Sequence, residues 1–192
     1  MRKMLECNTH SETYVKLPIQ PKVGQFEKVS YEQFKQAFEV MLDTYETHGQ
    51  ATETVIKQCY DSIELPTRAT KGSAGYDFKT PINCTLEVGQ TIIIPTGIRC
   101  NMDINYMLQM YPRSGLGFKF GMELVNTVGI IDSDYYFADN EGHIMVKIRP
   151  TIRTLQLRTG DKFAQGIFIP YGITRDDNAD GSRTGGIGST GK

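Results

Sequence analysis

Apolar residues recur at helical spacing in one early segment of the chain. Ser30 followed by Gln33 forms a capping-box pattern, so we expect a helix to begin there. Gly49 is expected to end it, and a second, weaker helix is expected over residues 52–60. An apolar stripe three and four residues apart typically packs on the protein's own body or a sister subunit. This stripe consists of Phe34, Phe38, Met41, Leu42 and Tyr45.

From about Glu64 the apolar period changes from helical to two. Ile144, Val146 and Ile148 recur at every second position and so share one strand face, as do Leu108 and Met110. Glycine and proline separate these short runs about every ten residues. The pattern predicts a mainly β sandwich, barrel or jelly roll. We therefore divide the chain into a helical extension (1–62), a β domain (63–172) and a flexible glycine-rich arm (173–192).

Composition excludes several classes of function. The 192 residues carry a formal net charge of −1, so no global field attracts nucleic acid or acidic membrane. No apolar run approaches the ~20 residues of a membrane span, and the first residues lack the apolar core of a signal peptide. The four cysteines have no C-x-x-C spacing, so reduced thiols are expected. We expect a cytoplasmic protein with no membrane or nucleic-acid partner.

The C-terminal segment from Gly186 to Lys192 reads G-x-x-x-x-G-K, which is most of a phosphate-binding P-loop. A working P-loop needs a buried strand before it and a helix after it. Here a polar run precedes the segment and nothing follows it, so we reject that interpretation. A disordered tail and an arm that closes over a ligand both remain open.

Two stretches of the β region carry candidate anion chemistry. A-G-Y-D-F places Gly75 at a tight backbone position and Asp77 at a strand edge, although for this stretch alone a simple turn is the preferred explanation. P-R-S-G-L-G follows a strand and joins a guanidinium (Arg113), a hydroxyl (Ser114) and a permissive glycine (Gly115) in one turn. Successive N–H groups in such a turn bind anions, and arginine adds a bidentate donor suited to phosphate.

Two further stretches carry a carboxylate and amides. The apolar run G-I-I leads into Asp132, where a rigid, partly desolvated carboxylate can act as a general base. Asn126 can pair with an amide-like base edge, and Tyr135 can lie flat on a sugar. An Asx-type turn at 132–134 is the structural alternative. Gln165 is a polar residue in an apolar run, for which a cross-strand hydrogen bond is the simpler explanation.

Together these stretches and the tail resemble, in order and spacing, the five motifs of the trimeric dUTPase family. The strongest pieces are P-R-S-G-L-G, G-I-I-D-S-D-Y and G-G-I-G-S-T-G. The likeness covers about two thirds of the chain, from near Glu64 to Lys192. It implies a jelly-roll-like β barrel that assembles as a homotrimer, with each active site built from all three chains.

The resemblance also implies an activity and a role for each residue. The reaction is hydrolysis of dUTP to dUMP and diphosphate with Mg²⁺ on the triphosphate, and Asp132 activates the attacking water. Tyr135 stacks on the deoxyribose, and Asp77 is a structural acid near the metal-bound phosphates. The implied phosphate ligands are Arg113, Ser114, Gly115 and Gln165. The implied uracil contacts are Asn126, Ile130, Ile131 and Met145. The implied arm contacts, to a nucleotide of another subunit, are Arg183, Ile187, Gly188, Ser189 and Thr190.

The chain departs from the family pattern in three places. Ile187 stands where many members have a phenylalanine that stacks on uracil, so either the affinity is lower or another aromatic residue, Tyr136 or Phe137, covers the base instead. The spacing from Arg183 to the following glycines is one residue shorter than usual. Residues 137–141 are an insertion that lengthens the uracil hairpin.

Two other functions remain open at this stage. The related dCTP deaminases share the fold, but their chemistry requires glutamate where Asp132 stands. The N-terminal helices alternatively dock a protein partner, with the nucleotide as a switch.

Overall fold

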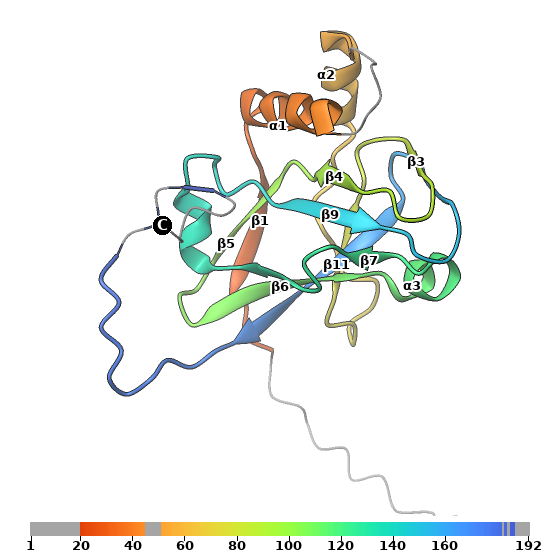
Figure 1. Cartoon of the computed structure of the whole chain (residues 1–192). Helices are drawn as coiled ribbons and strands as arrows, with labels where there is room; N and C mark the ends of the chain where they lie inside the picture. Colours follow the sequence, from red (N-terminus) through yellow and green to blue (C-terminus); the bar gives the residue numbers. More distant parts are fainter. Residues whose placement is uncertain (1–19, 45–50, 182, 184, 187–192) are drawn as a thin grey trace, which may run out of the picture.

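The computed structural model describes residues 20–44, 51–181, 183, 185 and 186. It is a mainly β molecule with two helices on one side (Figure 1). Its elements are β1 (Gly24–Lys28), α1 (Tyr31–Thr44), α2 (Glu53–Asp61), β2 (Tyr76–Lys79), β3 (Cys84–Leu86), β4 (Ile92–Pro95), β5 (Ile98–Met102), β6 (Tyr106–Pro112), α3 (Ser114–Phe120), β7 (Glu123–Leu124), β8 (Gly129–Ile131), η1 (Ser133–Phe137, a 3-10 helix), β9 (Met145–Arg149), β10 (Leu155–Leu157) and β11 (Lys162–Pro170).

All named strand pairs are antiparallel, in four sheets. The largest has the order β2-β11-β6-β8, and a three-stranded sheet has the order β4-β9-β7. The mainly β class is confirmed. A closed barrel is not formed by the described strands, because the ladders stop at β2 and β8 in one sheet and at β4 and β7 in the other.

The helix expected from Ser30 is confirmed as α1. The Ser30 hydroxyl accepts a hydrogen bond from Gln33 N at 3.1 Å, as an N-cap does. Phe34, Phe38 and Met41 are buried in the same hydrophobic cluster as the strands. The stripe therefore packs on the protein's own body, against β4. Tyr45 and Gly49, the expected last turn and stop, lie outside the described residues.

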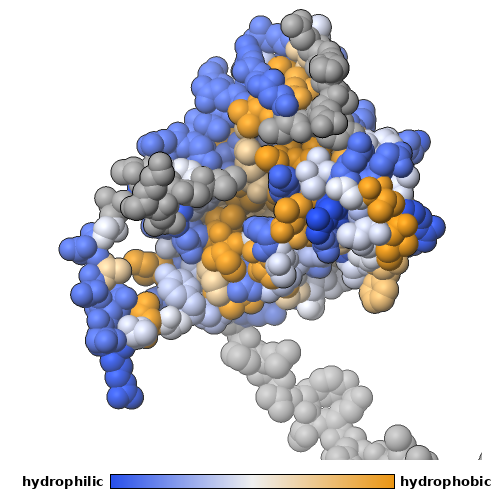
Figure 2. Space-filling model, in the orientation of Figure 1, coloured by the Kyte–Doolittle hydropathy of each residue, from blue (hydrophilic) through white to orange (hydrophobic). Residues whose placement is uncertain are grey.

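The second predicted helix is also confirmed, as α2 with Thr52 at its N-cap. The predicted strand around Ile144, Val146 and Ile148 forms β9, and all three side chains are buried. Figure 2 shows hydrophilic residues on the outer side of the helical region and an apolar area beneath it.

The strand β1 was not expected, since the segment before residue 62 was predicted to be helical. It pairs with β5 from Gly24↔Met102 to Lys28↔Ile98. Its burial does not alternate, because only Phe26 is buried within the strand. This burial pattern explains why a search for a period of two did not reveal β1. The pairing with β5 joins the N-terminal segment to the β structure.

Among the described residues, no helix combines the length and apolarity needed to cross a membrane.

Candidate functional site

Seven of the predicted site residues line one cavity of about 280 Å³. It is formed around β8 and η1, with β6 and β9 behind and the C-terminal arm beside it. Five further residues line it that the sequence had not indicated. The predicted residues are Asn126, Ile130, Ile131, Asp132, Tyr135, Met145 and Arg183, and the others are Met110, Leu124, Gly129, Val146 and Gly186.

Asp132 lies between β8 and η1 with its carboxylate toward the cavity. Its backbone is extended (ψ 158°), and its carbonyl accepts a hydrogen bond from Tyr135 N at 3.2 Å. Its side chain makes no capping bond to η1 and is half exposed. The turn here is thus formed by backbone groups and not by the Asp132 side chain, as it would be in an Asx-type turn. The carboxylate therefore remains available for other partners.

Arg183 is the partner of that carboxylate. Its Nη2 lies 2.5 Å from Asp132 Oδ2, and its Nε donates to Asp134 Oδ1 at 2.9 Å. The guanidinium carbon is 5.6 Å from the centroid of the Tyr135 ring. The arm leaves β11 and returns beside η1 (Figure 1), so its arginine covers the chain's own cavity. Ile187, Gly188, Ser189 and Thr190 lie outside the described residues.

Tyr135 is buried, and both hydrogen-bonding functions of its hydroxyl are used. It donates to the His143 carbonyl at 3.0 Å and accepts from Asn140 Nδ2 at 2.7 Å. Burial raises the pKa of the phenol, so it stays protonated at neutral pH. The ring is therefore held from behind, with its position set by the loop that follows η1.

One side of the cavity consists of an edge strand and an amide side chain. Among the described strands, β8 pairs only with β6, so its other edge offers unpaired backbone groups to a ligand. Ile130 in β8 and Asn126 before it are exposed. Met145 begins β9 on the neighbouring wall. Such an edge can form strand-like hydrogen bonds with a planar amide such as a pyrimidine base.

The predicted phosphate ligands form a second group, outside this cavity. Arg113 Nη1 pairs with Asp77 Oδ1, and Lys162 Nζ forms an ion pair 2.8 Å from the other carboxylate oxygen of Asp77. Asp77 is only 3% exposed, so both cations offset the cost of burying its charge. Ser114 and Gly115 are exposed at the start of α3.

Gln165 connects this second group to the sheet. Its Nε2 donates to the Pro112 carbonyl at 3.1 Å, beside Arg113. The cross-strand bond suggested by the sequence is therefore present. A Cβ atom at Gly75 would lie 2.4 Å from Gln165 Oε1, which confirms that position as a close approach.

Two aromatic residues were alternatives for covering the base, and neither lines the cavity. The Tyr136 hydroxyl donates to Glu27 Oε2 at 2.8 Å, and its ring lies 4.0 Å below the Arg99 guanidinium carbon. Phe137 is 75% exposed and stacks edge-on to Tyr136.

The sequence comparison identifies the family. The dUTPase family model matches residues 61–191, more than half of the chain. This chain belongs to the dUTPase family. The deoxyuridine 5'-triphosphate nucleotidohydrolase of Lactococcus lactis subsp. lactis (strain IL1403) is 39% identical over 143 residues, covering 72% of this chain and 95% of the relative. That of Escherichia coli (strain K12 / DH10B) is 36% identical over 137 residues, covering 67% and 87%.

Solved structures agree. The dUTPase of Streptococcus mutans is similar with a TM-score of 0.54 at 35% identity, over 59% of this chain and 90% of that one. A dUTPase from phage phi11 of S. aureus has a TM-score of 0.53 at 20% identity, over 63% and 92%, and supports the fold alone.

The family match begins at residue 61, so β1, α1 and most of α2 lie outside it. Nevertheless Glu27 of this dUTPase accepts a hydrogen bond from Tyr136 of η1, and Ser30 donates to Glu141 in the loop that follows η1. Sequence reasoning did not find these contacts, because no local pattern relates residues more than a hundred positions apart.

Proposed function

We propose that the chain is a cytoplasmic enzyme that hydrolyses dUTP to dUMP and diphosphate. The observation that carries the proposal is the half-exposed Asp132 carboxylate, which lines one cavity with Tyr135 and Asn126 in a member of the dUTPase family. This cavity offers a base, a flat surface for a sugar and an amide for a pyrimidine edge.

Asp132 acts as the general base in this proposal. It takes a proton from a water molecule, and the water oxygen attacks the α-phosphorus. The bond from the α-phosphorus to the oxygen bridging it to the β-phosphate breaks, and diphosphate leaves. A carboxylate held within reach of the water can accept this proton. Positioning and charge stabilisation supply most of the catalysis in such a transfer.

Arg183 has two uses in this mechanism. Without nucleotide it neutralises Asp132 and Asp134 and holds the arm over the cavity. With nucleotide it is expected to move to the phosphates, which releases the carboxylate for the water. A guanidinium suits this exchange because it pairs bidentately with carboxylate and phosphate alike.

Substrate selection belongs to the other walls of the cavity. Tyr135 lies against the deoxyribose and leaves no room for a 2′-hydroxyl. Asn126 and the edge of β8 around Ile130 and Ile131 pair with the uracil, with Met145 beside it. The tight backbone excludes a 5-methyl group.

Mg²⁺ enters this reaction as part of the substrate, bound to the triphosphate. Asp77 is already paired with Arg113 and Lys162, and the described residues contain no group of three or more His, Cys, Asp or Glu side chains that could hold a metal. These side chains suit an Mg²⁺ ion whose ligands are phosphate oxygens and water molecules. The phage phi11 dUTPase mentioned above coordinates a structural Mg(II) ion.

The homotrimer that the resemblance implies is supported by the division of the site into two groups. Asp132 and Tyr135 line the cavity, while Arg113, Ser114 and Gln165 lie outside it. In a threefold assembly the second group of one chain faces the cavity of its neighbour and grips the phosphates there. The arm residues from Ile187 to Thr190 close over the nucleotide.

The deciding experiment measures diphosphate release from Mg–dUTP by the wild type and by Asp132→Asn. Asparagine keeps the shape of the side chain but is a poor base, so we expect nucleotide binding to persist and turnover to fall by about 10²–10⁴-fold. Asp139→Asn is the matched control, because Asp139 is an exposed carboxylate just after η1, and this variant should remain active.

Other nucleotides separate this function from its alternatives. dTTP and UTP should be poor substrates, and dCTP should release no ammonia. Ammonia release would favour a deaminase, and absence of dUTP hydrolysis by the wild type would refute the proposal. The docking alternative has lost its main support, because the apolar face of α1 is buried within the chain.

A further inference from the structure

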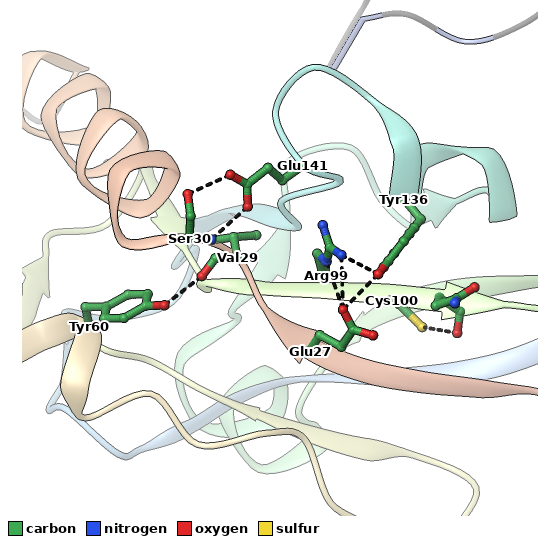
Figure 3. A network of polar contacts seen from close by, with 9 residues as sticks. Glu27, Val29, Ser30, Tyr60, Arg99, Cys100, Tyr136 and Glu141 are labelled. Atoms are coloured by element: carbon green, nitrogen blue, oxygen red, sulfur yellow. Dashed lines mark hydrogen bonds and ion pairs between the residues drawn. The ribbon is translucent and has the colours of Figure 1, made fainter.

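Residues 133–143, here called the Tyr135 loop, comprise η1 and the loop that follows it. Hydrogen bonds join them to the N-terminal segment (Figure 3). Glu141 Oε1 accepts from the Ser30 hydroxyl at 2.6 Å, and Oε2 accepts from Ser30 N at 2.7 Å. Both bonds are partly buried and join residues 111 positions apart. A bidentate pair of this kind fixes direction as well as distance.

Ser30 is itself held firmly, because it is the N-cap of α1. Gln33 N donates to its hydroxyl, and the preceding Val29 N donates to Gly97 O at 3.0 Å. The capping box expected from the sequence would use Gln33 to accept from Ser30 N, but Glu141 takes that place. A carboxylate at a helix N-terminus is favourable. Burial raises the pKa of Glu141, but the two bonds from Ser30 together with charge interactions with Arg99 and His143 outweigh it, so the net pKa is lowered.

A second anchor lies on the other side of the same loop. Tyr136 donates to Glu27 of β1, and Arg99 of β5 donates to both of them. In Figure 3 the side chains of Glu27, Arg99 and Tyr136 lie to the right of the Ser30–Glu141 pair. The N-terminal segment therefore contacts the loop both before and after residues 137–140.

The loop transmits this restraint to the cavity through Tyr135. Asn140, next to Glu141, donates to the Tyr135 hydroxyl, which donates to His143 O. Gly142 lies so close to η1 that a Cβ atom there would be 2.7 Å from Tyr135 O and from Tyr136 Cα. A shift of Glu141 would thus move the groups that hold the Tyr135 ring.

We propose that Glu141 is a positioning residue for nucleotide selection. It attaches the Tyr135 loop to β1 and the start of α1, which form a fixed support that we call the brace. The proposal rests on the function proposed above, since it assigns Tyr135 to the sugar. It gives residues 24–33, which lie outside the family match, a role in substrate choice.

The test compares Glu141→Ala, Ser30→Ala and their double variant in the full chain. Glu141→Ala should lose about tenfold in the preference for dUTP over UTP, expressed as kcat/KM, because a small displacement of a positioning group costs about that much or more. Ser30→Ala keeps the bond from its backbone N–H and should lose a smaller part of the preference. KM for dUTP should rise more than kcat falls, since Asp132 is untouched. The double variant should match Glu141→Ala, because Glu141→Ala already removes both bonds, including the hydroxyl bond that Ser30→Ala removes.

The matched control is Thr52→Ala, which removes the N-cap of α2, where Thr52 Oγ1 accepts from Val55 N. It should lower the melting temperature as Ser30→Ala does but leave the dUTP/UTP preference unchanged. Glu141→Gln retains one acceptor for Ser30 and should recover most of the preference. If Glu141→Ala fails to fold, Glu141→Gln takes its place in the comparison. An unchanged preference in both Glu141→Ala and Ser30→Ala, or an equal loss in Thr52→Ala, would overturn the proposal.

Hydrogen exchange of the nucleotide-free protein separates this proposal from the proposed function. Glu141→Ala and Ser30→Ala should each increase exchange over residues 129–144, and Thr52→Ala should not. If the wild type hydrolyses no dUTP, the proposed function is wrong, and hydrogen exchange alone then tests the brace. If the wild type is active and exchange in the loop is unaltered, the brace alone fails.

Discussion

His143 stands at the base of the loop that carries Tyr135 and has no solvent exposure. Its Nε2 accepts from Gly97 N at 2.8 Å, whereas the buried Nδ1 has no hydrogen-bond partner among the described residues. Burial lowers the pKa of its imidazole to about 4, and the nearby Glu141 carboxylate opposes this only in part. The histidine is therefore neutral in the folded protein, packed near Phe34.

This pKa predicts how stability depends on pH. Between pH 6.5 and 4 the unfolded chain binds a proton that folded His143 does not, so stability falls as pH falls through that range. From pH 7 to 5 the loss should be about 2 kcal/mol. Chemical denaturation at both pH values measures it. His143→Gln keeps an acceptor for Gly97 N and should show a smaller loss over the same interval, and an equal loss would contradict the assignment.

At the scale of single residues, sequence and structure agree best where chemistry is local. Asp132, Tyr135 and Asn126 were identified by their order and spacing, and the structure places them in one cavity. Glu141 was noted only as part of an insertion. Its partner Ser30 was assigned a local capping box, because sequence patterns assign the nearest partner and a carboxylate from 111 residues away can replace it.

At the scale of elements, periodicity predicted α1, α2 and β9 but not β1. A helix that buries one face has a strong apolar period, and α1 shows it in Phe34, Phe38 and Met41. The edge strand β1 pairs with β5 alone and buries only Phe26 within its length. A strand of this kind is specified by its partner, so its own residues give little signal.

The helix α1 is thus part of the core, which a truncation of one side chain can test. Phe34 has no exposed surface and lies 5.6 Å, centroid to centroid, from Tyr60 of α2. Phe34→Ala should lower the free energy of unfolding by about 3–5 kcal/mol. Val40→Ala, at a half-exposed position of the same helix, should cost less than about 1 kcal/mol. Denaturant unfolding measures both, and equal small effects would mean that α1 is a detachable appendage.

At the scale of the whole molecule, the two groups of site residues belong to different parts of one fold. Asp132 follows β8 at the edge of the largest sheet, whereas Arg113 follows β6 and is paired with Asp77 of β2. No spacing along the chain reveals whether two such groups serve the same nucleotide. The resemblance supplied the trimer in which they would meet, and a single chain does not test it.

Subunit complementation tests that arrangement directly. Asp132→Asn and Arg113→Gln should each be nearly inactive, with Lys162 still paired to Asp77 in the second variant. If Asp132 and Arg113 of a site come from different chains, unfolding and refolding an equal mixture should restore about a quarter of the wild-type activity, because that share of sites combines two intact groups. Sedimentation should give three times the 21.6 kDa chain mass. Each variant refolded alone is the control. A mixture no more active than the variants alone would place both residues of each site in one chain.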